Sequence, residues 1–203
     1  LHGEQGSAKS TSSRVIRRLV DPNKADLRDQ PKEARDLLIA ATNGWCIALD
    51  NLSHLPTWLS NALCRLSTGG GFGTRTLYEN DEETLFDAQR PIILNGIEDL
   101  ALRGDLMDRS IVLYLKAIPD DERRPEKRFW ADFERARPGI LGALLNAVSV
   151  ALEEADHLTL PALPRMADFA LWSAAAAPSL GWDRDTFIEA YSDNRESANR
   201  LTL

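Results

Sequence analysis

The glycine-rich segment 3–11 constrains the fold of this chain more than any other part of the sequence. It reads Gly-Glu-Gln-Gly-Ser-Ala-Lys-Ser-Thr and departs from the phosphate-binding pattern G-x-x-x-x-G-K-[ST] only at Ala8, where the pattern has its second glycine. Such a loop wraps backbone N–H groups around a polyphosphate, Lys9 reaches the β- and γ-phosphates, and Ser10 offers its hydroxyl to Mg²⁺. We therefore predict ATP and Mg²⁺ as cofactors. The predicted nucleotide contacts are Gly3, Glu4, Gln5, Gly6, Ser7, Ala8, Lys9, Ser10 and Thr11.

A helix is predicted directly after this loop, because apolar side chains recur at helical spacing from Val15 to Val20. A buried strand should precede the loop, yet only Leu1 and His2 stand before it. We expect the first strand to be largely missing and the chain to be a segment of a longer protein.

A second segment, Trp45 to Asn51, is an apolar run that ends in a carboxylate, as expected for a strand buried on both faces. A helix from Pro31 to Asn43 would connect it to the preceding part of the chain. In a doubly wound α/β sheet, Lys9 and Asp50 would meet at the carboxyl ends of parallel strands. Ser10 and Asp50 are the predicted metal ligands, and the alternative is a core strand with a chance aspartate.

Two further apolar runs predict central strands at residues 91–94 and 110–115. Asn95 follows the first run and is predicted to orient an attacking water beside the γ-phosphate. Arg109 precedes the second run and is predicted to contact the phosphate of a neighbouring subunit, with Arg103 as the next candidate. Between 72 and 90 the pattern predicts an inserted hairpin with an acidic turn, which argues against phosphate contact at its tip.

Together these segments resemble the AAA+ family of P-loop ATPases, and within it the helicase-like ATPase domain of phage and plasmid replication proteins of the primase-helicase, superfamily 3-like type. The resemblance covers nearly the whole chain. It is carried by Walker A at Gly3–Ser10, Walker B at Ile47–Asn51, sensor 1 at Asn95, an arginine finger at Arg109 and sensor 2 at Arg165.

The resemblance implies a three-layer α/β P-loop NTPase core at residues 1–118, with a central, mostly parallel sheet. A C-terminal helical lid would follow at 119–203, and Arg165 would contact the nucleotide from it. It also implies ATP hydrolysis, assembly into a homo-oligomeric ring, expected to be a hexamer, and DNA as a partner. On this reading Lys9, Asp50, Asn51, Asn95 and Arg109 are the catalytic residues.

Asn51 departs from many AAA+ enzymes, which carry a glutamate there to activate water. An amide cannot accept a proton at neutral pH, so Asn51 would have to orient water rather than deprotonate it. A nucleotide-gated remodelling or scaffolding ATPase without translocation is therefore the alternative to a motor. A P-loop kinase is the weakest reading, because a long helical segment follows the last predicted strand.

Net charge and composition limit the kinds of partner that this chain is expected to bind. The net charge is −7, which provides no global attraction for nucleic acid, although the first 35 residues hold eight basic and five acidic side chains. The two cysteines, Cys46 and Cys64, lack metal-ligand spacing and are expected to be free thiols. No run reaches the about 18 apolar residues of a membrane span, so we expect no membrane partner and a cytoplasmic location.

Overall fold

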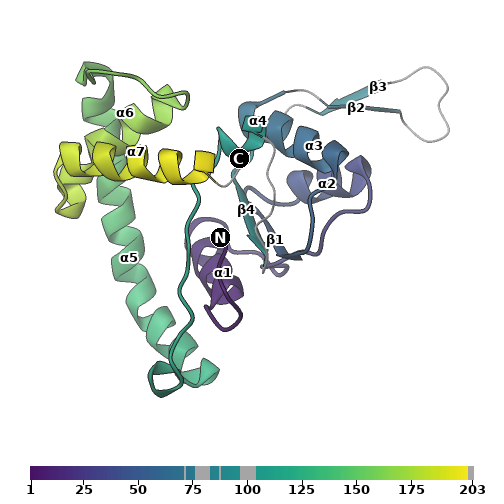
Figure 1. Ribbon diagram of the computed structural model, residues 1–203, viewed down its shortest axis with the longest axis horizontal. Helices are drawn as coiled ribbons and strands as arrows, with labels where there is room; N and C mark the ends of the chain where they lie inside the picture. Colours follow the sequence, from purple (N-terminus) through teal and green to yellow (C-terminus); the bar gives the residue numbers. More distant parts are fainter. Residues whose placement is uncertain (71, 76–82, 87, 97–103, 201–203) are drawn as a thin grey trace. The chain divides into compact units, whose positions relative to one another are not determined.

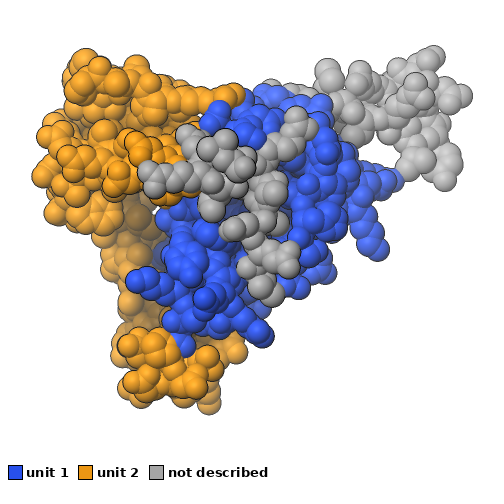
Figure 2. Space-filling view, viewed as in Figure 1, with its two compact units in different colours: residues 1–118, 199–203 blue, residues 119–198 orange. Residues whose placement is uncertain are grey.

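The computed structural model describes residues 1–70, 72–75, 83–86, 88–96 and 104–200. The chain divides into two compact units (Figure 2). Unit 1 contains Leu1–Ile118 with the C-terminal residues 199–203, and unit 2 contains Pro119–Ala198. Each unit is described by itself below.

The sheet of unit 1 is built on a parallel pair, β1 (Ile47–Leu52) and β4 (Ile92–Gly96). Both strands lie where the sequence predicts them. Arg28 forms a parallel bridge with Leu49 on one side of this pair. On the other side the nitrogen of Leu1 donates to the carbonyl of Leu94 at 2.6 Å, and His2 bridges in parallel to Tyr114. The neighbours of the two-stranded sheet thus occur in the order Arg28, β1, β4, residues 1–2 and residues 113–115, joined outside the β1–β4 pair by single bridges or hydrogen bonds.

The predicted strand at 110–115 is only partly realised, because its single bridge within the described residues is the one between Tyr114 and His2. The N–H of His2 donates to Leu113 at 3.0 Å and the N–H of Leu115 donates to His2 at 2.9 Å. Ile111 and Tyr114 are exposed. One paired residue is too little to define a strand.

The helices of unit 1 are α1 (Lys9–Val20), α2 (Ala34–Thr42), α3 (Thr57–Thr68) and the short α4 (Gly104–Met107), shown in Figure 1. Helix α1 contacts both β1 and β4, whereas α2 and α3 pack on β1 through an apolar core. On α3 the apolar positions recur every three or four residues, as expected for one buried helix face. The largest buried side chains of this core are Leu37, Ile47, Leu49, Leu52, Leu59, Leu63 and Leu66.

The predicted hairpin is present in its described part. β2 (Phe72–Arg75) pairs antiparallel with β3 (Glu83–Phe86), in a register that places Phe72 opposite Phe86. Both strands lie within the predicted range 72–90. Residues 76–82, which include most of the acidic turn, lie outside the described residues.

Unit 2 is helical and consists of α5 (Glu126–Glu154), α6 (Ala167–Ala176) and α7 (Arg184–Arg200), with short 3₁₀ turns at Asp120–Glu122, Ala155–His157 and Ala177–Leu180. Small residues, Ala151, Ala155 and Ala175, form its core and let α5 and α6 approach closely. The rings of Phe169 and Phe187 contact that of Tyr191.

Helix α5 with the following turn, Glu126–His157, is long and apolar enough to pass a test for a membrane span by length and composition. Core helices of soluble proteins pass the same test, and only 11% of its most apolar window is buried. This finding does not decide between membrane and solvent. The absence of a membrane partner and the cytoplasmic location stay predictions.

Candidate functional site

The loop that connects His2 to α1 takes backbone angles that few residues adopt. The φ angle is +145° at Gly3, +82° at Gly6 and +59° at Ala8. A Cβ atom at Gly3 would lie 2.1 Å from the carbonyl oxygen of Leu115, so this position excludes every other residue. Ala8 adopts the left-handed conformation, with ψ of 28°, which explains why glycine is usual at this position of the motif.

The loop ends at the N-terminus of α1, where backbone N–H groups are free to bind an anion. The first N–H groups of a helix have no intrahelical acceptor, and the N-cap residue, Ala8, makes no side-chain cap hydrogen bond. The first turn of α1 also contains no acidic residue. The helix itself therefore places no negative charge against the partial positive charge of its N-terminus.

The side chain of Lys9 is folded back across the loop. It is 8% exposed, and its Nζ atom donates to the carbonyls of Gly3 at 2.7 Å and Glu4 at 2.8 Å. A third, longer contact of 3.3 Å joins Nζ to Oγ of Ser7, which itself donates to Glu4 at 2.8 Å. Within the described residues, the hydrogen bonds of this buried cation therefore go to neutral oxygens of the loop.

The structure brings together the two predicted metal ligands, which are 40 residues apart in the chain. Ser10, in the first turn of α1, donates from Oγ to Oδ1 of Asp50 at 2.9 Å. Asp50 lies near the carboxyl end of β1, and α1, which begins at the end of the loop, contacts β1, so both residues reach one edge of the sheet.

Asn51 and Asn95 lie at the same edge. The N–H of Asn51 donates to Oδ1 of Asp50 and to Oδ1 of Asn95, both at 3.0 Å. The Nδ2 atom of Asn95 donates to Oγ of Ser13 at 3.2 Å. Asn95 is 2% exposed and Ser13 is fully buried, whereas Asn51 is exposed. Sequence reasoning missed Ser13, because a serine inside an amphipathic helix carries no distinguishing signal.

These residues line a cavity of about 430 Å³. Its walls are the loop and first turn of α1 on one side and the ends of β1 and β4 on the other. The lining residues are Gln5, Gly6, Ser7, Ala8, Lys9, Ser10, Thr11, Asp50, Asn51, Asn95 and Gly96. Among the described residues, no group of three or more His, Cys, Asp or Glu side chains could hold a metal ion by itself.

Of the predicted arginines, Arg109 is not among the described residues that line this cavity. Arg109 is half-buried just after α4, and its Nη1 donates to the carbonyl of Asp105 at 2.6 Å. Arg165 belongs to unit 2. Arg103 lies outside the described residues. The proposed contacts of these arginines with nucleotide stay predictions.

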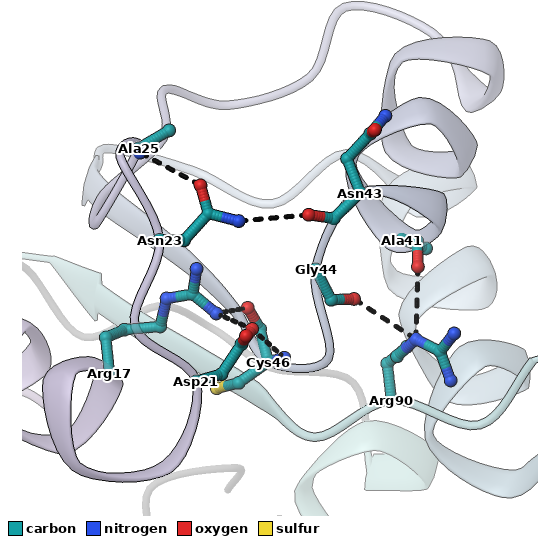
Figure 3. A network of polar contacts seen from close by, with 9 residues as sticks. All are labelled: Arg17, Asp21, Asn23, Ala25, Ala41, Asn43, Gly44, Cys46 and Arg90. Carbon is teal, nitrogen blue, oxygen red and sulfur yellow. Dashed lines mark hydrogen bonds and ion pairs between the residues drawn. The ribbon is translucent and has the colours of Figure 1, made fainter.

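The opposite, amino end of β1 is held by an ionised network (Figure 3). Arg17 is 1% exposed, and its Nη1 donates to Oδ2 of Asp21 and to the carbonyl of Cys46. The N–H of Cys46 donates in turn to Oδ2 of Asp21 at 2.8 Å. Burial acts to raise the pKa of Asp21, but the bond from Cys46 and the Arg17 charge outweigh it, so the pKa lies below its ordinary value. Burial raises the pKa of the Cys46 thiol, which stays protonated.

Side-chain hydrogen bonds to backbone carbonyls extend this network to the turn before β1 (Figure 3). Asn23 donates from Nδ2 to the carbonyl of Asn43 at 2.9 Å. Arg90 donates from Nε to the carbonyls of Ala41 at 3.0 Å and Gly44 at 3.2 Å. Its guanidinium also lies 4.9 Å from the ring centroid of the exposed Trp45. None of these residues borders the cavity, so the network is structural.

A glycine loop at a helix terminus, beside a carboxylate at the end of a parallel strand, defines a candidate phosphate-binding site. The family model described as actinomycete integrative conjugative element replication protein matches residues 1–197. The chain therefore belongs to this family of replication proteins. A comparison with curated proteins and one with solved structures found no match.

Proposed function

We propose that this chain is an ATP-binding and ATP-hydrolysing domain that acts in the replication of an integrative conjugative element. The observation that carries the proposal is the contact between Ser10 and Asp50 beside the loop that holds Lys9. A hydroxyl and a carboxylate in contact, next to free helix N–H groups and a buried ammonium, combine the groups that bind a magnesium–triphosphate complex.

The chemistry of the site fits this ligand. Mg²⁺ binds hard oxygen atoms and commonly uses one or two protein ligands with phosphate oxygens and water. Ser10 and Asp50 would hold it, and when bound it would neutralise charge on the phosphates. The loop N–H groups and Lys9 would hold the β- and γ-phosphates. Lys9 now bonds to neutral carbonyls, and its ammonium would bind anionic phosphate oxygens more strongly, because both partners are then charged.

The strand order supports a three-layer, AAA+-like P-loop fold for residues 1–118. Residues 1–2 connect through α1 to Arg28 at one edge of the sheet, whereas β4 connects to residues 113–115 at the other edge. The connections thus diverge between residues 1–2 and β4. Open parallel sheets bind ligands at the carboxyl ends of the strands at such a switch point, and the cavity lies there.

For hydrolysis, the proposal gives Asn51 the task of orienting water. Its side chain is exposed at the cavity, and an amide can both donate to and accept from a water molecule. Phosphoryl transfer depends chiefly on positioning and electrostatics, so an orienting amide supports catalysis without accepting the proton.

The second candidate is a nucleotide-gated remodelling or scaffolding protein without translocation. The identity of Asn51 favours it, because among the described residues that line the cavity Asp50 is the only carboxylate, and that group is bonded to Ser10. In the motor reading, the protein forms a homo-oligomeric ring on DNA and Arg109 completes a neighbour's site. ATP hydrolysis that rises with DNA and requires assembly separates the motor from the switch.

Calorimetry with ATP and Mg²⁺ tests the proposal. Lys9→Ala should weaken binding by roughly 100-fold, because it removes charge-assisted bonds of about 1.5–3 kcal/mol. Lys24→Ala, an exposed lysine after α1, is the matched control and should bind as the unsubstituted protein does. Absence of binding to the unsubstituted protein, or equal binding by Lys9→Ala, would overturn the proposal.

A further inference from the structure

The end of β1 is irregular at the position where the candidate site begins. Leu49 pairs with Leu94, and the next pair is Leu52 with Gly96, so Asp50 and Asn51 together stand opposite Asn95 alone. This is a β-bulge, a feature that is rare in parallel pairs and that redirects side chains near active sites. Asn51 also has a φ angle of +54°, the left-handed conformation that asparagine tolerates better than most residues.

The side chain of Asn95 occupies the hydrogen-bonding positions that the bulge leaves open. A backbone N–H can only donate, so the atom of Asn95 that faces the N–H of Asn51 must be the amide oxygen. The amide nitrogen then faces Ser13, whose hydroxyl oxygen accepts from it. Both ends of the Asn95 amide are therefore engaged within the protein, and the residue is buried.

These contacts close a ring of hydrogen bonds. From Ser10 the ring passes to Asp50, Asn51 and Asn95, and it returns to the same helix at Ser13. Helix α1 is thus connected to the bulge at two residues, three positions apart. Ser10 contacts Asp50 directly, and Ser13 is connected to Asn51 through the side chain of Asn95. Two attachment points fix both the position and the direction of Asp50 relative to Ser10.

We propose that Ser13 and Asn95 are positioning residues that brace the bulge of β1, so that Asp50 faces Ser10 in the geometry a divalent cation requires. The brace, rather than the orientation of an attacking water, is the task of the Asn95 side chain. This inference rests on the proposed binding of nucleotide with Mg²⁺. It assigns Ser13, which contacts neither the cavity nor a ligand, an effect on the metal-dependent part of that binding.

The first test needs no nucleotide. Amide hydrogen exchange of Asn51, followed by NMR, reports on the N–H that Asn95 and Asp50 both accept from. Asn95→Ala and Ser13→Ala should each speed this exchange, by about tenfold for the loss of one hydrogen bond. Combining the two substitutions should add little to Asn95→Ala alone, because they act in one chain of contacts. Unchanged exchange at Asn51 in both variants would overturn the brace.

The matched control is Ser60→Ala. Ser60 lies on α3, is 1% exposed, and its Oγ finds no hydrogen-bond partner among the described residues. It is the same substitution at an equally buried helical serine outside the ring. It should leave the exchange of Asn51 unchanged.

The second test measures ATP affinity by calorimetry with Mg²⁺ and with EDTA. In the unsubstituted protein Mg²⁺ should strengthen binding. Ser13→Ala should reduce this strengthening about fivefold or more while the affinity in EDTA stays within about twofold, because the loop and Lys9 are untouched. An unchanged Mg²⁺ effect in Ser13→Ala would overturn the inference.

The failure of the proposed function is a different result, namely no ATP binding by the unsubstituted protein in either buffer. In that case the rate of amide hydrogen exchange at Asn51 alone tests whether Ser13 and Asn95 brace the bulge. Ser13→Cys restores the side-chain volume but keeps only a weak acceptor. A loss of packing alone would predict full recovery of both effects, whereas the brace predicts only partial recovery.

Discussion

The two ends of β1 are built on opposite principles, although the same helix supports both. At the amino end, Arg17 and Asp21 place opposite charges around Cys46 and leave little exposed. At the carboxyl end, hydrogen bonds among Ser10, Asp50, Asn51 and Asn95 hold a bulge beside a cavity. A buried ion pair at one end and a redirected strand end beside a cavity at the other indicate which end anchors the fold and which carries function.

The largest expected effect tests the anchoring role of the amino end. Arg17→Met should lower the free energy of unfolding by about 3 kcal/mol, because it leaves Asp21 and the Cys46 carbonyl without their buried partner. Urea denaturation measures this loss. The control is Arg18→Met, whose partly exposed pair with Asp26 at 3.1 Å should matter by less than about 1 kcal/mol. Equal losses in both variants would contradict the distinction between the two ends.

The pH dependence of stability should come from the amino end as well. The pKa of Asp21 is lowered in the folded state, so the stability it contributes is complete above its unfolded pKa, about 3.9, and is lost as the pH falls through the folded pKa. The difference in stability between the unsubstituted protein and Asp21→Asn, measured by urea titration, should therefore be present at pH 6 and shrink below about pH 4. A constant difference across this range would rule out the assigned linkage.

A smaller effect of opposite sign is expected at the site. Ala8→Gly should raise the free energy of unfolding by about 0.5–1 kcal/mol, because glycine removes the left-handed strain that alanine bears, and this gain exceeds the cost of a more flexible unfolded chain. Thermal denaturation measures the shift. Destabilisation by Ala8→Gly would show that the loop holds alanine without strain.

The smallest effect is expected at Asn51, the other non-glycine residue with positive φ among the described residues. Asn51→Gly should change the free energy of unfolding by less than about 0.5 kcal/mol, because asparagine tolerates this conformation and glycine adds unfolded-state entropy. The same denaturation experiment compares the two sites. If Asn51→Gly raised the free energy of unfolding as much as Ala8→Gly, the backbone conformation of Asn51 in the bulge would be strained.

Local sequence features predicted most of the elements that carry the site. The loop at 3–8, helix α1, and strands β1 and β4 all lie where glycine pattern and apolar spacing place them, because these signals are read within about ten residues. The strand expected at 110–115 is reduced to one bridge at Tyr114, since a strand depends on its pairing partner as much as on its own sequence.

The sequence by itself determined the chemistry that is available: a lysine and a serine after a glycine loop, an aspartate at the end of an apolar run, and an asparagine after the next one. Only the tertiary structure decided that Ser10 meets Asp50, that Asn95 turns inward to Ser13, and that Arg17 crosses to Cys46. The physical reason is that these bonds join residues far apart in the chain. Their partners depend on strand order and on a single bulge, and neither leaves a pattern in any short stretch of sequence.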